Sequence, residues 1–303
     1  MSKDQITICV PATTANLGPG YDCLGMALDL WNEITVEIST TPKISILGEG
    51  SGILSEGKDN LVYESIQKFF QEIDEKPIPI SIDCNNNIPL ARGLGSSAAA
   101  IVGGLVAANR ICSNPLNQDD LLSLAVRLEG HGDNVAPALL GGLQAVVNDG
   151  GKIISENIPV PEEIVAVIFI PEMPMVTEEG RAILSKKISR DDAVYNLGRV
   201  AMLVNSLSSG SLSNLKIATQ DKLHQPDRAK IFPAMKYIIR SAENAGALCA
   251  FLSGAGSSII ALTNSRSMTI GYEMADVADK IGVPGVIKVT KISAMGAHIY
   301  AEE

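Results

Sequence analysis

The chain has 303 residues, of which 46% are hydrophobic, and it carries a formal net charge of −10. A chain of this length forms one large domain or two moderate ones. It buries about 75% of its extended surface, so its core does not need stabilisation by disulfides or a bound metal. Its acidic balance argues against nucleic acid as a partner, because no basic cluster of five or more residues is present to neutralise phosphates.

The sequence also argues against a membrane-bound or secreted protein. The N-terminal segment MSKDQITICV lacks the apolar core of a signal peptide, and no stretch of about 18 uninterrupted apolar residues occurs. The five cysteines are odd in number and scattered, without a CxxC pair, so neither a disulfide framework nor a zinc site is expected. We therefore predict a soluble, reduced, cytoplasmic protein without a membrane partner.

Strands and helices alternate along the first half of the chain. Alternation of β-branched residues predicts strands at 6–12, 33–40, 79–84 and 141–149. Apolar residues at helical spacing predict helices at 59–73, 96–109 and 118–130. Asp59 is the expected N-cap of the first helix, and Gly130 closes the third.

A change in composition marks the middle of the chain. Residues 150–163 (GGKIISENIPVPEE) contain glycines, two prolines and an acidic pair, and we interpret them as an inter-domain linker. Beyond them the pattern predicts strands at 164–172, 285–292 and two within 247–263, and helices at 191–209, 233–246 and 268–282. The expected fold is α+β in two lobes, with an N-terminal domain at 1–155 and a C-terminal domain at 160–303.

The segment PLARGLGSSAAAIVGG, at residues 89–104, places glycines and serines directly before a buried helix. Glycine permits positive φ and removes the Cβ that would keep a ligand away from the backbone. A helix that begins at Ser96 offers unpaired N–H groups and a partial positive charge, which together favour phosphate. The same residues also fit a close-packed structural turn. The segment is neither a Walker A loop nor a dinucleotide-binding GxGxxG, because it has neither spacing.

Three motifs in the chain resemble those of one enzyme superfamily. PLARGLGSSAAA resembles the phosphate-binding motif of the galactokinase, homoserine kinase, mevalonate kinase and phosphomevalonate kinase superfamily. PATTANLGPGYDCLGMAL near the N-terminus and LSGAGSSIIAL near the C-terminus match in the same order, and the set spans about residues 11–262. The resemblance implies ATP binding by loop residues, namely Pro89, Leu90, Ala91, Arg92, Gly93, Leu94, Gly95, Ser96, Ser97, Ala98 and Ala99.

Two stretches resemble the homoserine kinase family in particular. The first motif has that family's form, and EGHGDNVAPALLGG at 129–142 is similar to its EGHPDNVAP segment, with Gly132 in place of the usual proline. Ser257 likewise stands where proline is common. The resemblance implies a ribosomal-protein-like N-terminal lobe, a ferredoxin-like C-terminal lobe, ATP with Mg²⁺, and phosphorylation of L-homoserine on the route to threonine. A homodimer is common in that family.

The resemblance also assigns the substrate-binding groups. Asn16 and Asp22 would bind the amino end of homoserine, with His131 and Asn134 close by. The arginines Arg181 and Arg228 would bind the carboxylate or the transferring phosphoryl group, since guanidinium binds such anions in a bidentate manner. Thr177 would lie near the γ-phosphate.

Each of these residues also has a simpler interpretation. Asp22 could cap a helix, His131 and Asn16 could be ordinary turn residues, and either arginine could belong to a surface ion pair. Arg228, for example, stands beside Asp227.

Glu129 is the expected magnesium ligand, together with Ser96 or Ser97, because Mg²⁺ keeps several waters and needs few protein ligands. The alternative for this glutamate at a helix end is a solvated charge. Asp133 is the candidate base near the acceptor hydroxyl, yet a carboxylate with a pKa near 3.9 is a weak base for an alcohol. Phosphoryl transfer has a loose transition state, so early deprotonation of the hydroxyl is not required. The resemblance to homoserine kinases implies that Asn134 positions the substrate and that Asp133 is structural.

Three other functions compete with homoserine phosphorylation. A mevalonate-type kinase of the same superfamily would accept an alcohol without an α-amino group. A regulatory protein would bind ATP without transferring its phosphoryl group. An NAD-dependent dehydrogenase ranks last, because the strand-GxGxxG-helix fingerprint is absent.

Overall fold

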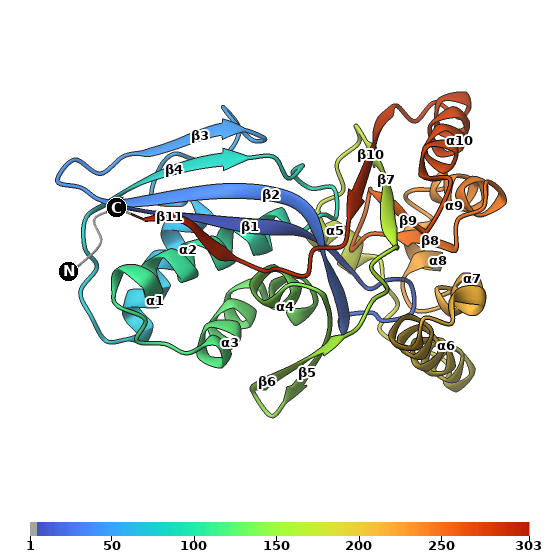
Figure 1. Cartoon of the computed structure of the whole chain (residues 1–303), viewed down its shortest axis with the longest axis horizontal. Helices are drawn as coiled ribbons and strands as arrows, with labels where there is room; N and C mark the ends of the chain where they lie inside the picture. The colour runs from blue at the N-terminus through green and yellow to red at the C-terminus, as the bar shows by residue number, and fades with distance from the viewer. Residues whose placement is uncertain (1–4, 303) are drawn as a thin grey trace.

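The computed structural model describes residues 5–302 and has two lobes, each built on one β-sheet (Figure 1). The first sheet has the strand order β11-β1-β2-β4-β3, and β5 extends it by pairing with β2 and β6. Its strands are β1 (Gln5–Ala15), β2 (Leu24–Ile38), β3 (Ile44–Gly48), β4 (Ile80–Asn86), β5 (Leu143–Asp149), β6 (Lys152–Ile158) and β11 (His298–Glu302). All neighbouring pairs are antiparallel except β3 with β4.

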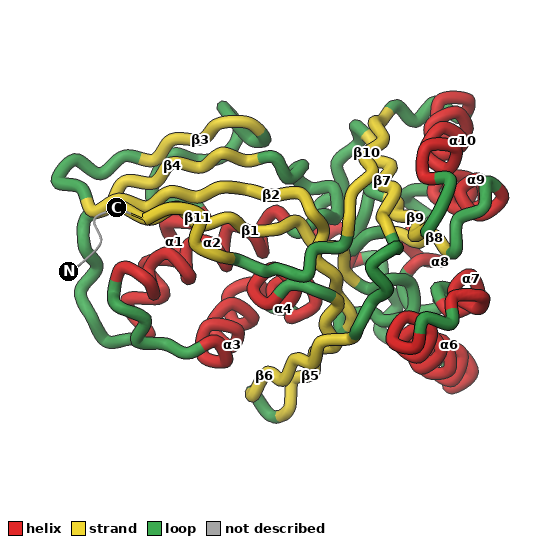
Figure 2. The backbone as a smooth tube through the Cα atoms, in the orientation of Figure 1, coloured by secondary structure: helices red, strands yellow, loops and turns green. Residues whose placement is uncertain are grey.

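Four helices cover one face of the first sheet (Figure 2). They are α1 (Leu61–Glu72), α2 (Ser96–Ile111), α3 (Gln118–Glu129) and α4 (Gly132–Leu140). Helix α2 packs closely against β1 and β2, because Gly103 faces Ile34 without a Cβ between them. Asn60 caps α1 by accepting from the N–H groups of Val62 and Tyr63, so the prediction of Asp59 as the cap was wrong by one residue. Asp59 instead accepts from the Ser55 hydroxyl outside the helix.

The second lobe is an antiparallel sheet of order β10-β7-β9-β8. Its strands are β7 (Val165–Pro171), β8 (Cys249–Leu252), β9 (Ile259–Thr263) and β10 (Gly285–Lys291), and α9 (Met235–Asn244) and α10 (Ser267–Lys280) pack on it. The chain order β-α-β-β-α-β with this strand order is the ferredoxin-like arrangement. The expected two-lobed α+β fold is therefore confirmed.

The predicted linker at 150–163 is wrong for most of its length, because residues 152–158 form strand β6 and pair with β5. The glycine pair Gly150 and Gly151 has positive φ and makes the turn of this hairpin. Only the short proline-containing segment between β6 and β7 crosses to the second lobe. The chain crosses back after β10, so that β11 pairs with β1 in the first sheet.

Further helices, one of them 20 residues long, lie where the two lobes meet. They are α5 (Thr177–Ala182), α6 (Arg190–Ser209), η1 (Leu212–Asn214), α7 (Leu215–Ala218) and α8 (Gln225–Arg228). The loop between β1 and β2 reaches these helices, and a Cβ on Gly18 would lie 2.0 Å from the Thr219 carbonyl oxygen. Among residues 5–302, none of the helices is both long and apolar enough to cross a bilayer.

Candidate active site

The two lobes enclose a cavity of about 1160 Å³. It is lined by the β1–β2 loop, the glycine loop of residues 89–97, the end of α3, the start of α4, helix α5 and Arg228. Residues far apart in the sequence therefore meet at one site. Every residue predicted to bind ATP, metal or substrate lines this cavity except Ala98 and Ala99, which are buried in the core.

The glycine loop is a close-packed turn. Leu94 anchors it in the core at 1% exposure. Gly93 and Gly95 both have φ of 71°, in the left-handed region that glycine adopts readily. A Cβ on Gly93 would lie 2.1 Å from the Ser253 carbonyl oxygen, and one on Gly95 would lie 1.9 Å from the Thr13 hydroxyl. Contacts within the protein thus require both glycines, whatever ligand approaches.

Arg92 ties the glycine loop to the second lobe. Its guanidinium donates to the carbonyl oxygens of Leu90, Pro171 and Glu172, the last two at the end of β7. The Ala91 carbonyl in turn accepts from the Met175 N–H at 2.8 Å. The loop is therefore held from both sides of the cavity.

Glu129 and Ser97 meet at the start of helix α2. The Ser97 hydroxyl donates to the Glu129 carboxylate at 2.6 Å, and the Glu129 side chain is only 8% exposed. The solvated-charge interpretation of Glu129 is therefore wrong. Burial raises the pKa of Glu129, while the Ser97 hydrogen bond and the nearby His131 oppose this shift. A buried carboxylate with a hydroxyl oxygen beside it is a donor set that suits Mg²⁺.

Residues 5–302 contain no group of three or more His, Cys, Asp or Glu side chains placed to hold a metal. A site for Mg²⁺ does not require one, because this ion is commonly held by one or two carboxylates and by substrate phosphates. The residues present therefore fit a magnesium ion that is shared with a nucleotide.

Asp22 and Arg181 form a bidentate ion pair in the cavity. The Arg181 nitrogens lie 2.6 and 3.0 Å from the two Asp22 oxygens, and Arg181 also donates to the Tyr21 hydroxyl at 3.0 Å. The hydrogen bond to Asp22 raises the pKa of Arg181 against the effect of burial. No helix begins at Asp22, which lies in the β1–β2 loop with φ of 57°, so the helix-cap alternative is wrong.

Asn16 fixes the shape of the β1–β2 loop. Its side-chain oxygen accepts from the Asp22 N–H at 3.0 Å, and its amide nitrogen donates to the Gly254 carbonyl at 3.1 Å. Its φ of 72° is the left-handed conformation that asparagine tolerates. Asn16 is thus a turn former that also lines the cavity and joins the first and third motifs.

Arg228 lies at the floor of the cavity and is only 2% exposed. Its guanidinium donates to the carbonyl oxygens of Gly180 and Gly254 and contacts His224. The surface ion-pair alternative is wrong, because Asp227 pairs with Lys230 instead. Burial lowers the pKa of Arg228, although the group stays charged.

His131 and Asp133 are paired at the start of α4. His131 Nδ1 lies 2.9 Å from an Asp133 oxygen, and Asp133 is 2% exposed. Burial disfavours charge on His131, but the hydrogen bond to Asp133 and the charges of Asp133 and Glu129 outweigh it and raise the pKa of His131. Next to them, Asn134 accepts from the Thr13 hydroxyl at 2.9 Å. Thr177 is exposed and lines the cavity from the start of α5.

Three residues that contact the cavity-lining residues Asn134, Arg181 and Arg228 were not predicted from the sequence. Thr13 and Tyr21 stand within the first motif, so the motif itself was a signal for them. His224 stands four residues before Arg228, a spacing that brings two side chains together on a helical turn. Tyr21 connects the two arginines, whose guanidinium carbons lie 5.7 and 5.8 Å from its ring centroid.

Two family descriptions match the chain. Residues 60–142 match the N-terminal domain of GHMP kinases, and residues 203–268 match their C-terminal domain. The first match contains the glycine loop and Glu129, and the second contains Arg228. Mevalonate diphosphate decarboxylase from Enterococcus faecalis, at 15% identity and a TM-score of 0.68 over 98% of this chain, shares the fold.

Proteins named homoserine kinase are similar over nearly the whole chain. That of Moorella thermoacetica is 43% identical, covering 92% of this chain and 94% of the relative, and that of Synechocystis sp. is 40% identical, covering 97% and 98%. The crystal structure of homoserine kinase from Cytophaga hutchinsonii has a TM-score of 0.89 at 32% identity, covering 99% of this chain and 98% of that one. This chain belongs to the homoserine kinase family of GHMP kinases.

Proposed function

We propose that the protein transfers the γ-phosphoryl group of ATP to the side-chain hydroxyl of L-homoserine, which gives O-phospho-L-homoserine and ADP for threonine biosynthesis. The observation that carries the proposal is the Asp22–Arg181 pair, which shares one cavity with the glycine loop and with Arg228. Family membership supports the same reaction.

The charged groups match a zwitterionic amino acid. An α-ammonium group needs a carboxylate, for which Asp22 is available, and an α-carboxylate needs guanidinium groups, for which Arg181 and Arg228 are available. The two charges of the substrate replace the contacts that Asp22 and Arg181 make with each other. Mevalonate lacks the ammonium group and would leave Asp22 unpaired.

ATP is assigned to the glycine loop. Helix α2 begins at Ser96, so its free N–H groups and positive end face the cavity. Thr177 lines the opposite side, near the expected γ-phosphate. Glu129 would hold Mg²⁺ together with Ser97, whose hydroxyl already contacts it, or with the adjacent Ser96. The ion would neutralise the charge of the phosphates.

Positioning and electrostatics account for the catalysis, because the loose transition state of phosphoryl transfer does not require early deprotonation of the hydroxyl. Asp133 is buried and already hydrogen-bonded to His131, which suits a residue that orients the imidazole. Asn134, held by Thr13, is placed to orient the substrate hydroxyl. Arg181 and Arg228 would stabilise the anionic groups.

The test is release of ADP with Mg·ATP, measured with L-homoserine, mevalonate, L-serine or no acceptor. Turnover on L-homoserine alone is the expected result. Turnover on mevalonate would keep the kinase and overturn the substrate. ATP binding without turnover on any acceptor would instead indicate a regulatory protein.

We further propose a cytoplasmic location and a homodimer. The five cysteines are free, as expected in a reducing compartment. Sedimentation equilibrium of the purified protein tests the assembly, and a mass near 31.9 kDa would overturn the dimer.

A further inference from the structure

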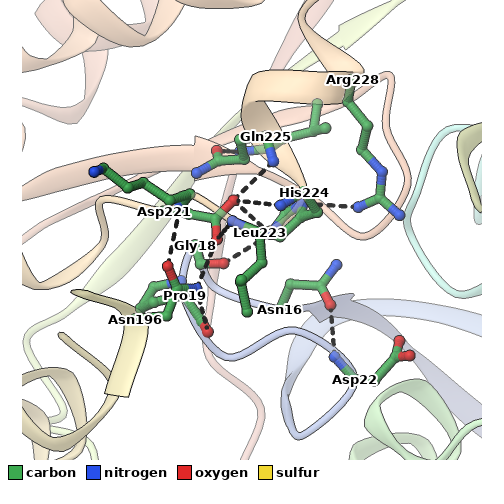
Figure 3. A network of polar contacts seen from close by, with 12 residues as sticks. Asn16, Gly18, Pro19, Asp22, Asn196, Asp221, Leu223, His224, Gln225 and Arg228 are labelled. Atoms are coloured by element: carbon green, nitrogen blue, oxygen red, sulfur yellow. Dashed lines mark hydrogen bonds and ion pairs between the residues drawn. The ribbon is translucent and has the colours of Figure 1, made fainter. Parts of the chain in front are cut away.

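A buried polar network connects His224 to the β1–β2 loop and to Arg228 (Figure 3). His224 is 0% exposed and stands directly before helix α8, which carries Arg228. Its Nε2 lies 2.7 Å from the Gly18 carbonyl oxygen, and its Nδ1 lies 2.8 Å from Arg228 Nη1. The imidazole therefore joins the β1–β2 loop of the first lobe to an arginine of the second.

These two contacts define the tautomer of the imidazole, and Nε2 also lies 3.5 Å from a carboxylate oxygen of Asp221. A carbonyl oxygen only accepts, so Nε2 carries the proton toward Gly18. A guanidinium only donates, so Nδ1 is unprotonated and accepts from Arg228. Burial lowers the pKa of His224 to about 4, in agreement with a neutral ring. His224 is thus a fixed acceptor for Arg228 Nη1.

Asp221 holds the backbone around His224 in place. Its two oxygens accept from the N–H groups of Leu223, His224 and Gln225 and from the Asn196 amide. Asn196 also donates to the Pro19 carbonyl in the β1–β2 loop. The position of His224 is therefore set by hydrogen bonds from both lobes.

The hydrogen bonds of the Arg228 guanidinium show which of its N–H groups are left for a ligand. Guanidinium has five N–H donors. Nε donates to the Gly180 carbonyl, and Nη1 uses its two N–H groups on His224 and the Gly254 carbonyl. Within residues 5–302, Nη2 has no protein acceptor, and Arg228 lines the cavity. The three bonded donors thus leave two N–H groups of Nη2 for a ligand in the cavity.

We infer that His224 is a positioning residue that aims Nη2 of Arg228 at the substrate carboxylate. The inference rests on the proposed function and adds a residue that does not line the cavity itself. His224 links the β1–β2 loop, which carries Asp22, to Arg228 of the opposite lobe. The two charged groups therefore belong to one amino-acid site. A core histidine that only fills space would affect folding but not the choice of substrate.

Two variants separate the hydrogen bond to Arg228 from the space that His224 fills. His224→Leu removes both contacts and keeps a similar bulk. His224→Asn keeps an oxygen acceptor near the place of Nδ1, so it retains the contact with Arg228 and loses that with Gly18. We expect His224→Leu to raise KM for L-homoserine about 10–100-fold with little change in KM for ATP. The reason is that the two N–H groups of Arg228 Nη2 are then no longer held in position. The asparagine variant should recover most of the loss.

The carboxamide of L-homoserine supplies a readout that a structural role would not move. The carboxamide lacks the carboxylate, so kcat/KM for the carboxamide should fall less than about threefold in His224→Leu. The ratio of kcat/KM for L-homoserine to kcat/KM for the carboxamide should therefore fall nearly as much as kcat/KM for L-homoserine itself. In an Arg228→Leu background, His224→Leu should add less than about threefold, because both changes remove one function. His298→Asn is the matched control, since His298 lies outside the cavity and contacts the Gly296 carbonyl.

The outcomes are distinguishable. Equal losses on acid and carboxamide, or additive losses in the double variant, would overturn the role of His224 and leave the proposed function intact. Absence of turnover on L-homoserine by the unaltered protein would overturn both. Unfolding by urea and the affinity for ATP, measured for every variant, identify any that fails to fold.

Discussion

Asp22 and Arg181 form an ion pair, and this determines what their replacement does. Arg181→Ala removes a carboxylate-binding group and also leaves Asp22 unpaired in a half-buried cavity. Asp133→Asn changes a side chain that is already engaged with His131. Asp22 and Asp133 therefore differ in function, because Asp22 pairs with Arg181 and Asp133 with His131 in the same cavity.

We predict that Arg181→Ala lowers kcat/KM for L-homoserine about 10²–10³-fold, the range for one well-placed charged donor. Asp133→Asn should lower it less than about tenfold, because the amide oxygen still accepts from His131 and a loose transition state needs no strong base. Steady-state kinetics on both variants checks this. Total loss in Asp133→Asn with little loss in Arg181→Ala would reverse the ranking and make Asp133 the base.

Glu129 supplies the second prediction at this scale. Glu129→Gln removes the carboxylate while keeping an acceptor for Ser97, so we expect the Mg²⁺ concentration for half-maximal rate to rise at least about tenfold. Initial rates as a function of Mg²⁺ at fixed ATP measure this. Glu64→Gln, on the exposed side of α1, is the control. An unchanged Mg²⁺ dependence in Glu129→Gln would exclude Glu129 as the metal ligand.

Among the elements, the glycine loop combines two demands, backbone conformation and close packing. Gly93 and Gly52 have nearly the same positive φ, 71° and 73°, but a Cβ on Gly93 meets the Ser253 carbonyl while one on Gly52 meets nothing within 4 Å. The pair therefore separates conformational strain from contact.

We predict that Gly52→Ala lowers the free energy of unfolding by about 1 kcal/mol, the strain of a left-handed alanine. Gly93→Ala should lower it by at least about 3 kcal/mol, because the glycine loop must also move away from residues 253–256. Urea unfolding measures both. Equal losses in the two variants would show that the contact with Ser253 is unimportant for stability.

Most helices and strands could be predicted because their residue patterns are local. The prediction failed where a structure depends on contacts between residues far apart in the sequence. The two-lobed α+β fold followed from local periodicity. The ferredoxin-like lobe and nearly all of the predicted site residues that line the cavity were implied by the resemblance of three motifs to the superfamily. Helix α4 was missed because it is short and contains Pro137. Strand β6 was taken for a linker because its hairpin glycines and the following prolines resemble one. The link from His224 to Gly18 spans 206 residues, and no local pattern signals such a contact.

For the whole molecule, buried His224 makes stability depend on pH. The unfolded chain protonates this imidazole below about pH 6.5, whereas the folded protein does so only near pH 4. The unfolded state therefore binds more protons in this window, and stability falls as pH is lowered through it. The contribution is about 3 kcal/mol between pH 6.5 and pH 4, at about 1.4 kcal/mol for each pH unit.

We predict that His224→Asn abolishes this part of the pH dependence, although its stability at pH 7 differs from that of the unaltered protein. Free energies of unfolding in urea at pH 4.5 and 7.0 measure the slope. His298→Asn should keep the slope, since His298 lies outside the His224 network and contacts the Gly296 carbonyl. Burial raises the pKa of Glu129, so Glu129 contributes to the pH dependence of stability with the opposite sign. This contribution is the same in the unaltered protein and in His224→Asn, and it cancels in their difference. Parallel slopes for all three proteins would contradict the prediction.

The pairing of β11 with β1 has a consequence for the protein as it is synthesised. Strand β1 lies between β2 and β11, so its outer edge stays open until residues 298–302 have left the ribosome. The nascent first lobe therefore cannot complete its sheet ahead of the second, and the β1 edge stays exposed while the whole second lobe is being made.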